Sequence, residues 1–219
     1  MSGRMAAPVS AKRVRAGRPT REQASARQAE LLEAALDMFL DRGFVLTTME
    51  GVAAAVGMTK RTVYASYPDK AALFHATVAH AIERSIVPRE ELERLDTGDL
   101  EETLVAVARM RVAFVTTPEG LKLQRIINTE SYRFPEIFLL AYERAAKPVV
   151  AFLADLLRRH DSAGAIGPDG HEMAARMFMS MVVGGPVRII VSGNTLSQDE
   201  IDARIHFAVR LFLNGVRPR

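Results

Sequence analysis

Apolar residues recur every three to four positions along most of the chain from about Ala26 onward, and this period constrains the fold more than any other feature. Between Leu32 and Leu40, apolar side chains occupy one helical face and acidic side chains the other. No segment shows the sustained alternation of apolar and polar residues that indicates a strand. We therefore predict an all-α protein of about nine helices.

Local signals predict where several helices begin and end. Gly43 should end the first helix. Thr47 should cap the second, with Glu50 three residues later completing a capping box. Pro68 disfavours helix in the residue before it, and Asp69 can cap a long fourth helix. The predicted helices cover about 26–42, 48–56, 59–65, 70–87, 99–116, 119–133, 136–160, 170–191 and 198–214.

The charge of the chain is unevenly distributed. The net charge is +3, but residues 1–70 carry 11 Lys and Arg against 7 Asp and Glu, whereas residues 71–219 carry 18 against 19. This asymmetry favours a polyanionic partner for the N-terminal part, although basic tails can also serve only as solubilising ends. The densest cluster, without any acidic residue, is Lys12, Arg13, Arg15, Arg18 and Arg21.

Composition excludes several classes of protein. The chain has no cysteine, which rules out disulfides, cysteine-ligated metals and a cysteine nucleophile. No run of signal-peptide length appears near the N-terminus, and no stretch approaches 18 uninterrupted apolar residues. We therefore expect a cytoplasmic protein with no membrane partner.

Three short helices separated by tight turns have the outline of a helix-turn-helix unit. The second helix of such a pair enters the major groove of DNA with its N-terminal residues foremost. Lys60 and Arg61 can reach guanine or phosphate there, and the hydroxyl of Tyr64 can reach the backbone. Free amides near Thr48 and Lys70 suit flanking phosphates. The alternative is that Lys60 and Arg61 are simply a solvated helix start.

The stretch from Gly43 to Phe74 resembles the DNA-binding domain of the TetR/AcrR family of transcriptional regulators. Matching features are Gly43-Phe44, Thr47-Thr48, Val52-Ala53, Gly57, Thr59-Lys60, Val63-Tyr64, Tyr67-Pro68-Asp69-Lys70 and Leu73-Phe74. The resemblance implies DNA contacts from Thr48, Thr59, Lys60, Arg61, Thr62, Tyr64, Ser66 and Lys70. Arg61 departs from the glycine common in the family, Ser66 from histidine, and Tyr67 from a buried phenylalanine. We interpret Tyr67 as a core residue with its hydroxyl at the rim.

The segment before the first helix contains Gly17-Arg18-Pro19 beside Arg15 and Arg21. An extended basic arm of this kind suits the narrow minor groove of A·T-rich DNA. Plain electrostatic anchoring, or disorder, is the alternative. We therefore assign 1–25 to a basic arm and 26–74 to the helix-turn-helix domain, and the resemblance to the TetR/AcrR family implies a ligand-binding and dimerisation domain over 75–219.

The C-terminal part is rich in flexible apolar side chains, which suit a pocket for a hydrophobic effector, although a methionine stripe at helical spacing also suits a core. A motif from Glu130 to Glu136 resembles a subgroup of AcrR-like regulators. The two closing helices are apolar on more than one side, which predicts a partner subunit. Candidate ligand-binding residues are Met110, Phe114, Ile127, Met177 and Met181, and candidate dimer residues are Val187, Ile190, Phe207 and Leu211.

An enzyme is the contrasting possibility, because helical bundles can hold metal centres. None of the five histidines has a Glu three residues before it, and no phosphate-binding or nucleophile-elbow motif occurs. We therefore expect no catalytic residue, no metal and no cofactor. The sequence predicts a homodimeric repressor that leaves a palindromic DNA operator when a small hydrophobic effector binds. The alternatives are an architectural DNA-binding protein without an effector and a helical enzyme.

Overall fold

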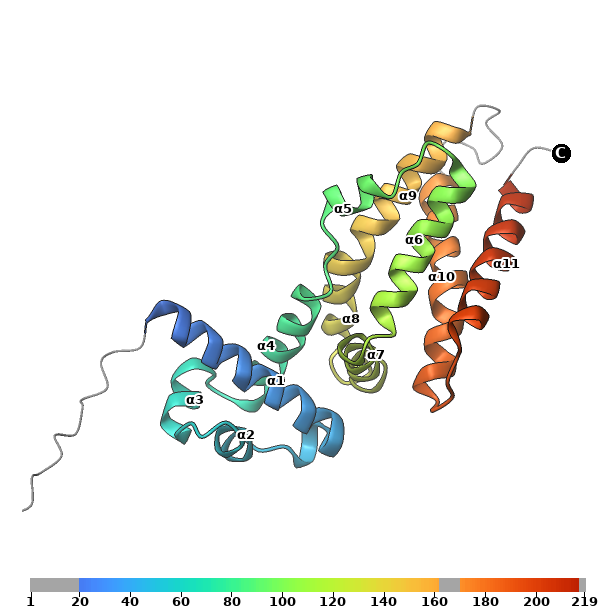
Figure 1. Cartoon of the computed structure of the whole chain (residues 1–219). Coiled ribbons are helices and arrows are strands. Elements are labelled where there is room, and N and C mark those ends of the chain that lie inside the picture. The colour runs from blue at the N-terminus through green and yellow to red at the C-terminus, as the bar shows by residue number, and fades with distance from the viewer. Residues whose placement is uncertain (1–19, 162–169, 217–219) are drawn as a thin grey trace, which may run out of the picture.

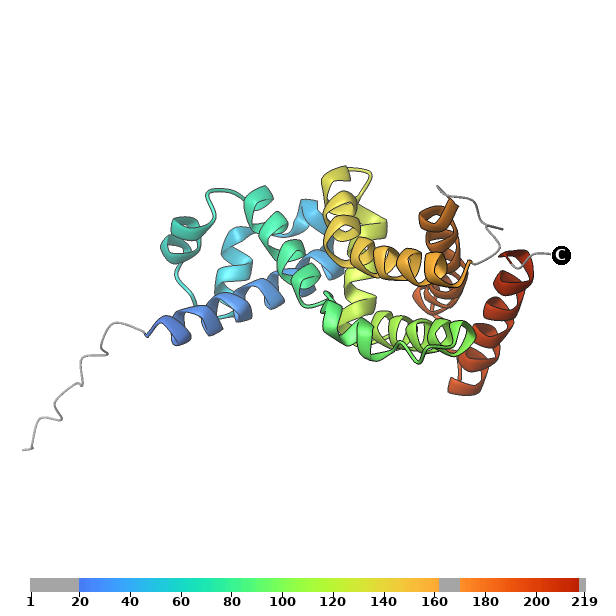
Figure 2. The ribbon, with the colours of Figure 1, turned by 90° about the horizontal axis from the view of Figure 1, so that it is seen from above.

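The computed structural model describes residues 20–161 and 170–216, and every regular element in these two ranges is a helix. The all-α prediction is thereby confirmed. Helices α1, α2 and α3 lie at one end of an elongated molecule, and α10 and α11 lie at the other (Figures 1 and 2). The N-terminal helices are α1 (Arg21–Leu46), α2 (Met49–Ala55), α3 (Lys60–Ser66) and α4 (Lys70–Glu83).

The remaining helices form the larger part of the molecule. A short α5 that the sequence did not predict follows Pro88, and the single helix expected over 136–160 is divided by a π-helical turn, η1. These elements are α5 (Arg89–Arg94), α6 (Leu100–Val115), α7 (Pro118–Glu130), α8 (Pro135–Ala141), η1 (Tyr142–Ala146), α9 (Lys147–His160), α10 (Gly170–Val191) and α11 (Gln198–Val216).

Helix α1 begins at Arg21, five residues before the predicted start. The Thr20 hydroxyl accepts a hydrogen bond from the Gln23 amide at 3.2 Å, and the Gln23 side chain accepts one from the Thr20 amide at 3.1 Å. This reciprocal cap satisfies two backbone donors, so the helix can start there. Residues 21–25 are therefore helical, although they were assigned to the arm.

The predicted N-cap of α2 is wrong by one residue. Thr48, not Thr47, caps the helix, and its hydroxyl accepts from the Gly51 amide at 3.1 Å. Thr47 is buried, and its hydroxyl donates to the carbonyl oxygens of Met38 and Gly43. Gly43 has a φ of 71°, so the chain bends sharply at the predicted stop. Thr47 is therefore the residue that fixes this bend.

Helix α4 begins at Lys70 under the predicted Asp69 cap but ends at Glu83, four residues before the predicted end. Ser85 explains the early stop, since its hydroxyl and its amide both bond to the Ile82 carbonyl oxygen. Local hydrogen bonds of this kind compete with helix continuation. The turn at residues 84–85 and the irregular residues 86–88 that follow it bring Val87 into the core and lead into α5.

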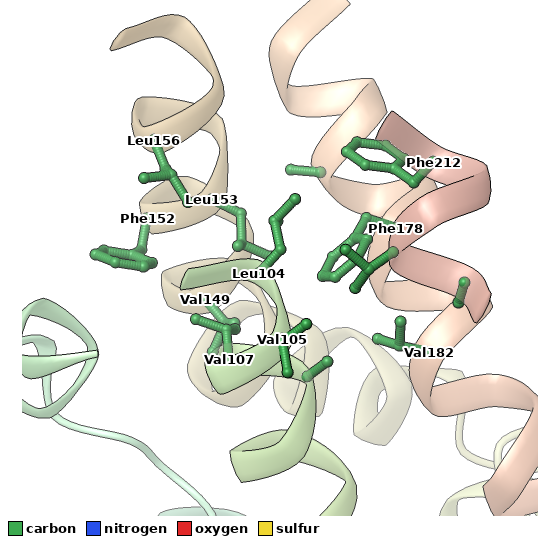
Figure 3. Close-up of a cluster of buried hydrophobic side chains, with 14 of the residues drawn as sticks. Leu104, Val105, Val107, Val149, Phe152, Leu153, Leu156, Phe178, Val182 and Phe212 are labelled. Atoms are coloured by element: carbon green, nitrogen blue, oxygen red, sulfur yellow. The ribbon is translucent and has the colours of Figure 1, made fainter. Parts of the chain in front are cut away.

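The buried side chains form two clusters. The first, which we call the head core, joins α1–α4 with residues of α7, α8 and η1, among them Leu123, Ile126 and Ile137. The second, the distal core, joins α6, α9, α10 and α11 (Figure 3). The head core therefore extends well past residue 74, where the sequence suggested a domain boundary. Figure 3 labels Leu104, Val105, Val107, Val149, Phe152, Leu153, Leu156, Phe178, Val182 and Phe212 of the distal core.

Aromatic rings join the head to the larger part of the molecule. Phe134, just before α8, has its ring centroid 4.7 Å from that of Phe74 and 4.9 Å from that of Phe44. Phe39 meets the Phe74 ring edge-on at 5.1 Å. Such pairs add to the free energy of burial. The Glu130–Glu136 motif thus supplies a residue that anchors the head.

Helix α10 contains a span, Gly170–Ile190, long enough and apolar enough to cross a bilayer, with a mean hydropathy of 1.3 and 28% of its residues buried. The sequence analysis predicted no such span. A single helix of this kind is weak support for a membrane protein, since helices of soluble proteins meet the same criterion. Its exposed apolar face still requires a physical explanation.

Gly120 is required where α7 leaves the end of α6. A β-carbon there would lie 2.9 Å from Cα of Val115 and would also clash with the carbonyl oxygen of Phe114. We expect Gly120→Ala to lower the free energy of unfolding by about 1–3 kcal/mol, because the backbone must move to relieve the overlap. Urea denaturation would measure the loss. Gly215→Ala is the control, since nothing lies within 4 Å of its added β-carbon; equal stability of both variants would contradict the prediction.

Candidate DNA interface and ligand cavities

Helix α3 presents one buried side and one open side. Its only fully buried residue, Val63, is 1% exposed and packs into the head core. This contact fixes the rotation of the helix and turns the polar side chains outward. Thr59 caps the helix, and its hydroxyl lies 2.8 Å from that of Thr62. The exposed predicted residues are Thr59, Lys60, Arg61, Thr62, Tyr64 and Ser66.

Lys60 is held by neighbours within the head. Its ammonium lies 2.5 Å from the Glu50 carboxylate of α2 and 5.3 Å from the centre of the Tyr64 ring. The hydrogen bond with Lys60 lowers the pKa of the Glu50 carboxyl, and the same contact raises the pKa of Lys60. All three side chains are exposed. Lys60 must therefore exchange Glu50 for any other anion that it binds.

Arg61 differs from Lys60 in this respect. Its side chain is exposed, and within residues 20–161 and 170–216 it makes no ion pair. A planar guanidinium with five donors can bind two acceptors at once. Arg61 is thus the basic group of α3 that is ready to bind without losing a partner.

Thr48 and Lys70, the predicted DNA contacts on either side of α3, also make contacts within the protein. The Thr48 hydroxyl is occupied in capping α2, but the side chain remains exposed. The Lys70 ammonium donates to the Val45 carbonyl at 2.9 Å and lies 4.7 Å from the centre of the Phe44 ring. Tyr67 is 6% exposed, and its hydroxyl accepts from the Gln28 amide at 2.9 Å, as expected for a core residue with its polar end at the rim. Arg15 and Arg18 lie outside the described residues.

A cavity of about 360 Å³ lies where the head meets the rest of the molecule. Its walls come from α1, α4, the end of α6 and α7. The Nε2 atom of His80 on α4 is buried there without a hydrogen-bond partner in the described chain. Phe114, a predicted ligand residue, lines this cavity. The cavity therefore touches both the head and the larger part.

A second cavity of about 160 Å³ adjoins the first and shares four lining residues with it, Ser85, Phe114, Gly120 and Leu123. Ile127, another predicted ligand residue, lines it. The sequence analysis missed all four polar lining residues, which are Ser85, Arg111, Gln124 and Tyr142. Arg111 falls on the stripe of α6 that includes Leu104 and Val115, and a lone arginine on an apolar stripe was a signal that could have been read.

The structure separates the other predicted ligand residues from these cavities. Met110 is half-buried against the distal core. Met177 and Met181 are 52% and 37% exposed. The reason is that Phe178 and Val182, one position along, are buried and take the inner side of α10. The two methionines therefore belong to an outer face of that helix.

An open groove of about 530 Å³ runs between α10 and α11. Phe207 and Leu211 of α11, both predicted dimer residues, are 62% and 55% exposed and line it together with Met181. Val187 is 7% exposed, because it already packs within its own chain, and Ile190 is half-buried. Large apolar side chains are thus exposed on α10 and α11, which lie at the end of the molecule opposite the head (Figure 1).

The histidines and carboxylates offer no sign of a metal centre in the part of the chain that the structure describes, where no group of three or more could hold an ion. His75 pairs with Glu136 at 3.2 Å, and His171 pairs with Asp161 at 3.1 Å. Arg109 reaches both Asp202 and His206. These side chains therefore act as links between helices.

Comparison with known proteins places these features in context. Residues 31–77 match the family of bacterial regulatory proteins named after TetR, and residues 102–215 match the C-terminal domain of AefR-like transcriptional repressors. The chain is 25% identical over 193 residues to the HTH-type transcriptional repressor Rv1474c of Mycobacterium tuberculosis, covering 88% of this chain and 94% of that protein.

Solved structures agree with these matches. The flavonoid-responsive regulator FrrA is 30% identical with a TM-score of 0.66, over 89% of this chain and 99% of its own. A TetR-family regulator from Mesorhizobium loti is 25% identical with a TM-score of 0.70, over 90% of this chain and 98% of its own. The likeness therefore covers both the DNA-binding head and the larger helical part.

Proposed function

Because the chain belongs to the TetR family of bacterial regulatory proteins, we propose that it represses transcription as a homodimer on a palindromic operator and leaves that operator when a small effector binds. It is a helix-turn-helix DNA-binding regulator, and such a protein acts in the cytoplasm, where the DNA is. The observation that carries the effector part is the 360 Å³ cavity, whose walls come from α1 and α4 of the head and from α6 and α7.

The exposed side of α3 is the proposed reading surface. Its N-terminal residues would enter the major groove, with Arg61 and Lys60 reaching base edges and the threonine hydroxyls reaching phosphate. The N-terminal arm would follow the neighbouring minor groove. The proposed contacts are Thr48, Thr59, Lys60, Arg61, Thr62, Tyr64, Ser66 and Lys70, with Arg15 and Arg18 in the arm.

The head core offers a route from the cavity to the DNA. Effector binding that moves α7 must also act on α4, because Leu123 and Ile126 of α7 belong to the same buried cluster as Phe74 of α4. Surface ion pairs cross the same junction, Lys122 with Asp37 and Arg144 with Glu83. A ligand that prefers one arrangement of these helices shifts the population toward it by its differential affinity. The distance between two reading helices would change as a result.

The exposed apolar groove between α10 and α11 supports dimerisation through these two helices. A twofold axis would place the same patch of each subunit against the other, which hides apolar surface that a monomer would expose. It would also hold the two copies of α3 at a constant separation, about one turn of DNA, as a palindromic site requires. Phe207, Leu211 and Met181 are the proposed contacts, with Ile190 at their edge.

Footprinting on the DNA upstream of its own gene tests the whole proposal. We expect protection of a palindrome that disappears when an effector is added. Equal binding to all sequences, with no compound having an effect, would instead favour an architectural DNA-binding protein. Specific binding that compounds strengthen would favour an activator or a corepressor mechanism over release.

If α3 reads bases, replacing its two basic residues should weaken operator binding by unequal amounts. We expect Arg61→Ala to weaken operator binding by about 1–3 kcal/mol and to relax specificity at one position of each half-site. Lys60→Ala should cost less, because Lys60 must first leave Glu50. Titration of the operator and of scrambled DNA at constant salt measures both values. Arg158→Ala removes an exposed arginine of α9 as the control, and operator binding that is unchanged in both α3 variants would contradict the assignment.

A further inference from the structure

Arg111 of α6 is a buried cation without an anion. The residue is 7% exposed, and its Nε and Nη1 atoms have no hydrogen-bond partner in the described chain. Its guanidinium carbon lies 5.7 Å from the centre of the Phe114 ring. It forms no ion pair with any carboxylate of residues 20–161 or 170–216. The positive charge therefore lies beside an aromatic ring and is not balanced by a carboxylate.

Such an arrangement is costly for the free protein. Burial lowers the pKa of the Arg111 guanidinium, because the charged form loses its hydration. Arginine nevertheless keeps its proton in proteins, so the charge cannot be removed by titration. Buried charges in folded proteins are normally paired and hydrogen-bonded. An unpaired one at the wall of a cavity indicates a site whose counterion arrives from outside.

A second unsatisfied group lies in the same cavity. The hydroxyl of Tyr142 is buried without a partner, and Tyr142 lines the 160 Å³ cavity together with Arg111 and Gln124. Tyr142 is the first residue of η1, and π-helical turns are frequent at functional sites. Arg111 and Tyr142 thus bring donors from two separate helices to one small space.

Apart from Ser85 and Gln124, the rest of the lining has no polar side chain. Phe114, Ile127 and Phe138 contribute to the wall around the two polar groups. The adjoining 360 Å³ cavity offers further room, with the unpartnered Nε2 of His80 at its wall. A ligand could therefore place one charged end at Arg111 and extend an apolar body toward α4.

We propose that Arg111 and Tyr142 bind the carboxylate of an amphipathic organic acid, and that this acid is the effector. The fork of the guanidinium matches the two oxygens of a carboxylate, and the phenol hydroxyl donates to one of them. The inference rests on the proposed function and refines it, since the expected ligand is an acid and not a purely hydrophobic molecule. His80 at the far side links the bound acid to α4.

The binding of matched compounds to the proposed dimer, in the absence of DNA, tests whether the ligand is an acid. The probes are straight-chain and phenyl-substituted carboxylic acids of increasing length, each paired with its own primary amide and alcohol. Calorimetry and the rise in Tm should show that the best acid binds wild-type protein at least about tenfold more tightly than its amide, the size expected of a charged hydrogen bond. If no acid of the series binds more tightly than its amide, the proposal is wrong.

Variants test whether Arg111 is responsible for the preference for the acid over its amide. Arg111→Met should remove the preference for the acid while leaving amide binding in place, and Arg111→Lys should retain part of it. Tyr142→Phe should weaken acid binding by a smaller factor. Arg109→Met is the matched control, because Arg109 lies on the same helix but is exposed and paired with Asp202. An acid preference that survives in Arg111→Met would also overturn the assignment.

DNA binding separates this inference from the proposed function. A protein that binds its operator but shows no preference for acids would contradict only the inference about Arg111. A protein that binds acids through Arg111 but protects no operator would contradict the proposed function, whereas the inference of a carboxylate site would still be supported. Release of the operator by the best acid, and its loss in Arg111→Met, would support both.

Discussion

Replacing Phe207 and Leu211 together with glutamate should convert the proposed dimer into a monomer that no longer recognises its operator. The two side chains are 62% and 55% exposed in the single chain, so the substitutions should not disturb its own core. In the proposed dimer they would place four carboxylates at an apolar contact, and unpaired buried charges cost several kcal/mol. Operator affinity should fall by about 10³-fold or more, to the level of non-specific binding.

Sedimentation at micromolar concentration and operator titration measure the two consequences. The control replaces Tyr132 and Leu139 with glutamate, which adds the same charge at exposed apolar side chains away from α10 and α11. We expect the control to remain dimeric and to bind the operator. Dissociation of the control, with an intact dimer in the α11 variant, would place the interface elsewhere.

Phe74→Ala should lower the free energy of unfolding by about 3–5 kcal/mol, the usual range for removing a fully buried aromatic ring. Phe74 is 0% exposed, and its ring centre lies 5.1 Å from that of Phe39, 5.4 Å from that of Phe44 and 4.7 Å from that of Phe134. The loss should affect α7 and α8 as well as the head, because these elements share one core.

Urea denaturation followed by circular dichroism and by tyrosine fluorescence measures this loss. Tyr132→Ala is the control, since Tyr132 is fully exposed and its removal should change stability by only about 0.5 kcal/mol. If Phe74→Ala changes the stability equally little, or if it unfolds the head while α7 and α8 stay intact, the shared core does not unfold as one cooperative unit.

Helix ends were predictable to the extent that nearby side chains set them. Asp69 caps α4 where the sequence indicated, because a cap needs only an oxygen and an amide three residues apart. The choice between Thr47 and Thr48 was missed, because both residues have the required chemistry. Only packing decides it, by burying Thr47 against Met38 and Gly43.

The cavities that we propose as the effector site were the least predictable feature. Met177 and Met181 matched the expected chemistry of a flexible pocket, but α10 is rotated so that Phe178 and Val182 face the core. Which of two adjacent apolar stripes turns inward depends on the shapes of the helices that it meets, and those helices come from distant parts of the chain. Arg111 was overlooked because arginine is mostly exposed in proteins, although its place on the apolar stripe of α6 was a local signal of burial.

The sequence by itself determined the helical class, the order and approximate positions of the helices in the helix-turn-helix unit, and the exposure of the residues at the start of α3. These properties follow from periodicity and capping, which act over a few residues. Tertiary structure alone decided that Phe134 anchors the head, that the methionine stripe faces outward, and that Arg111 stands unpaired in a cavity. Each of these depends on which surfaces meet after the chain has folded, since burial is a property of the whole packing and not of any local stretch.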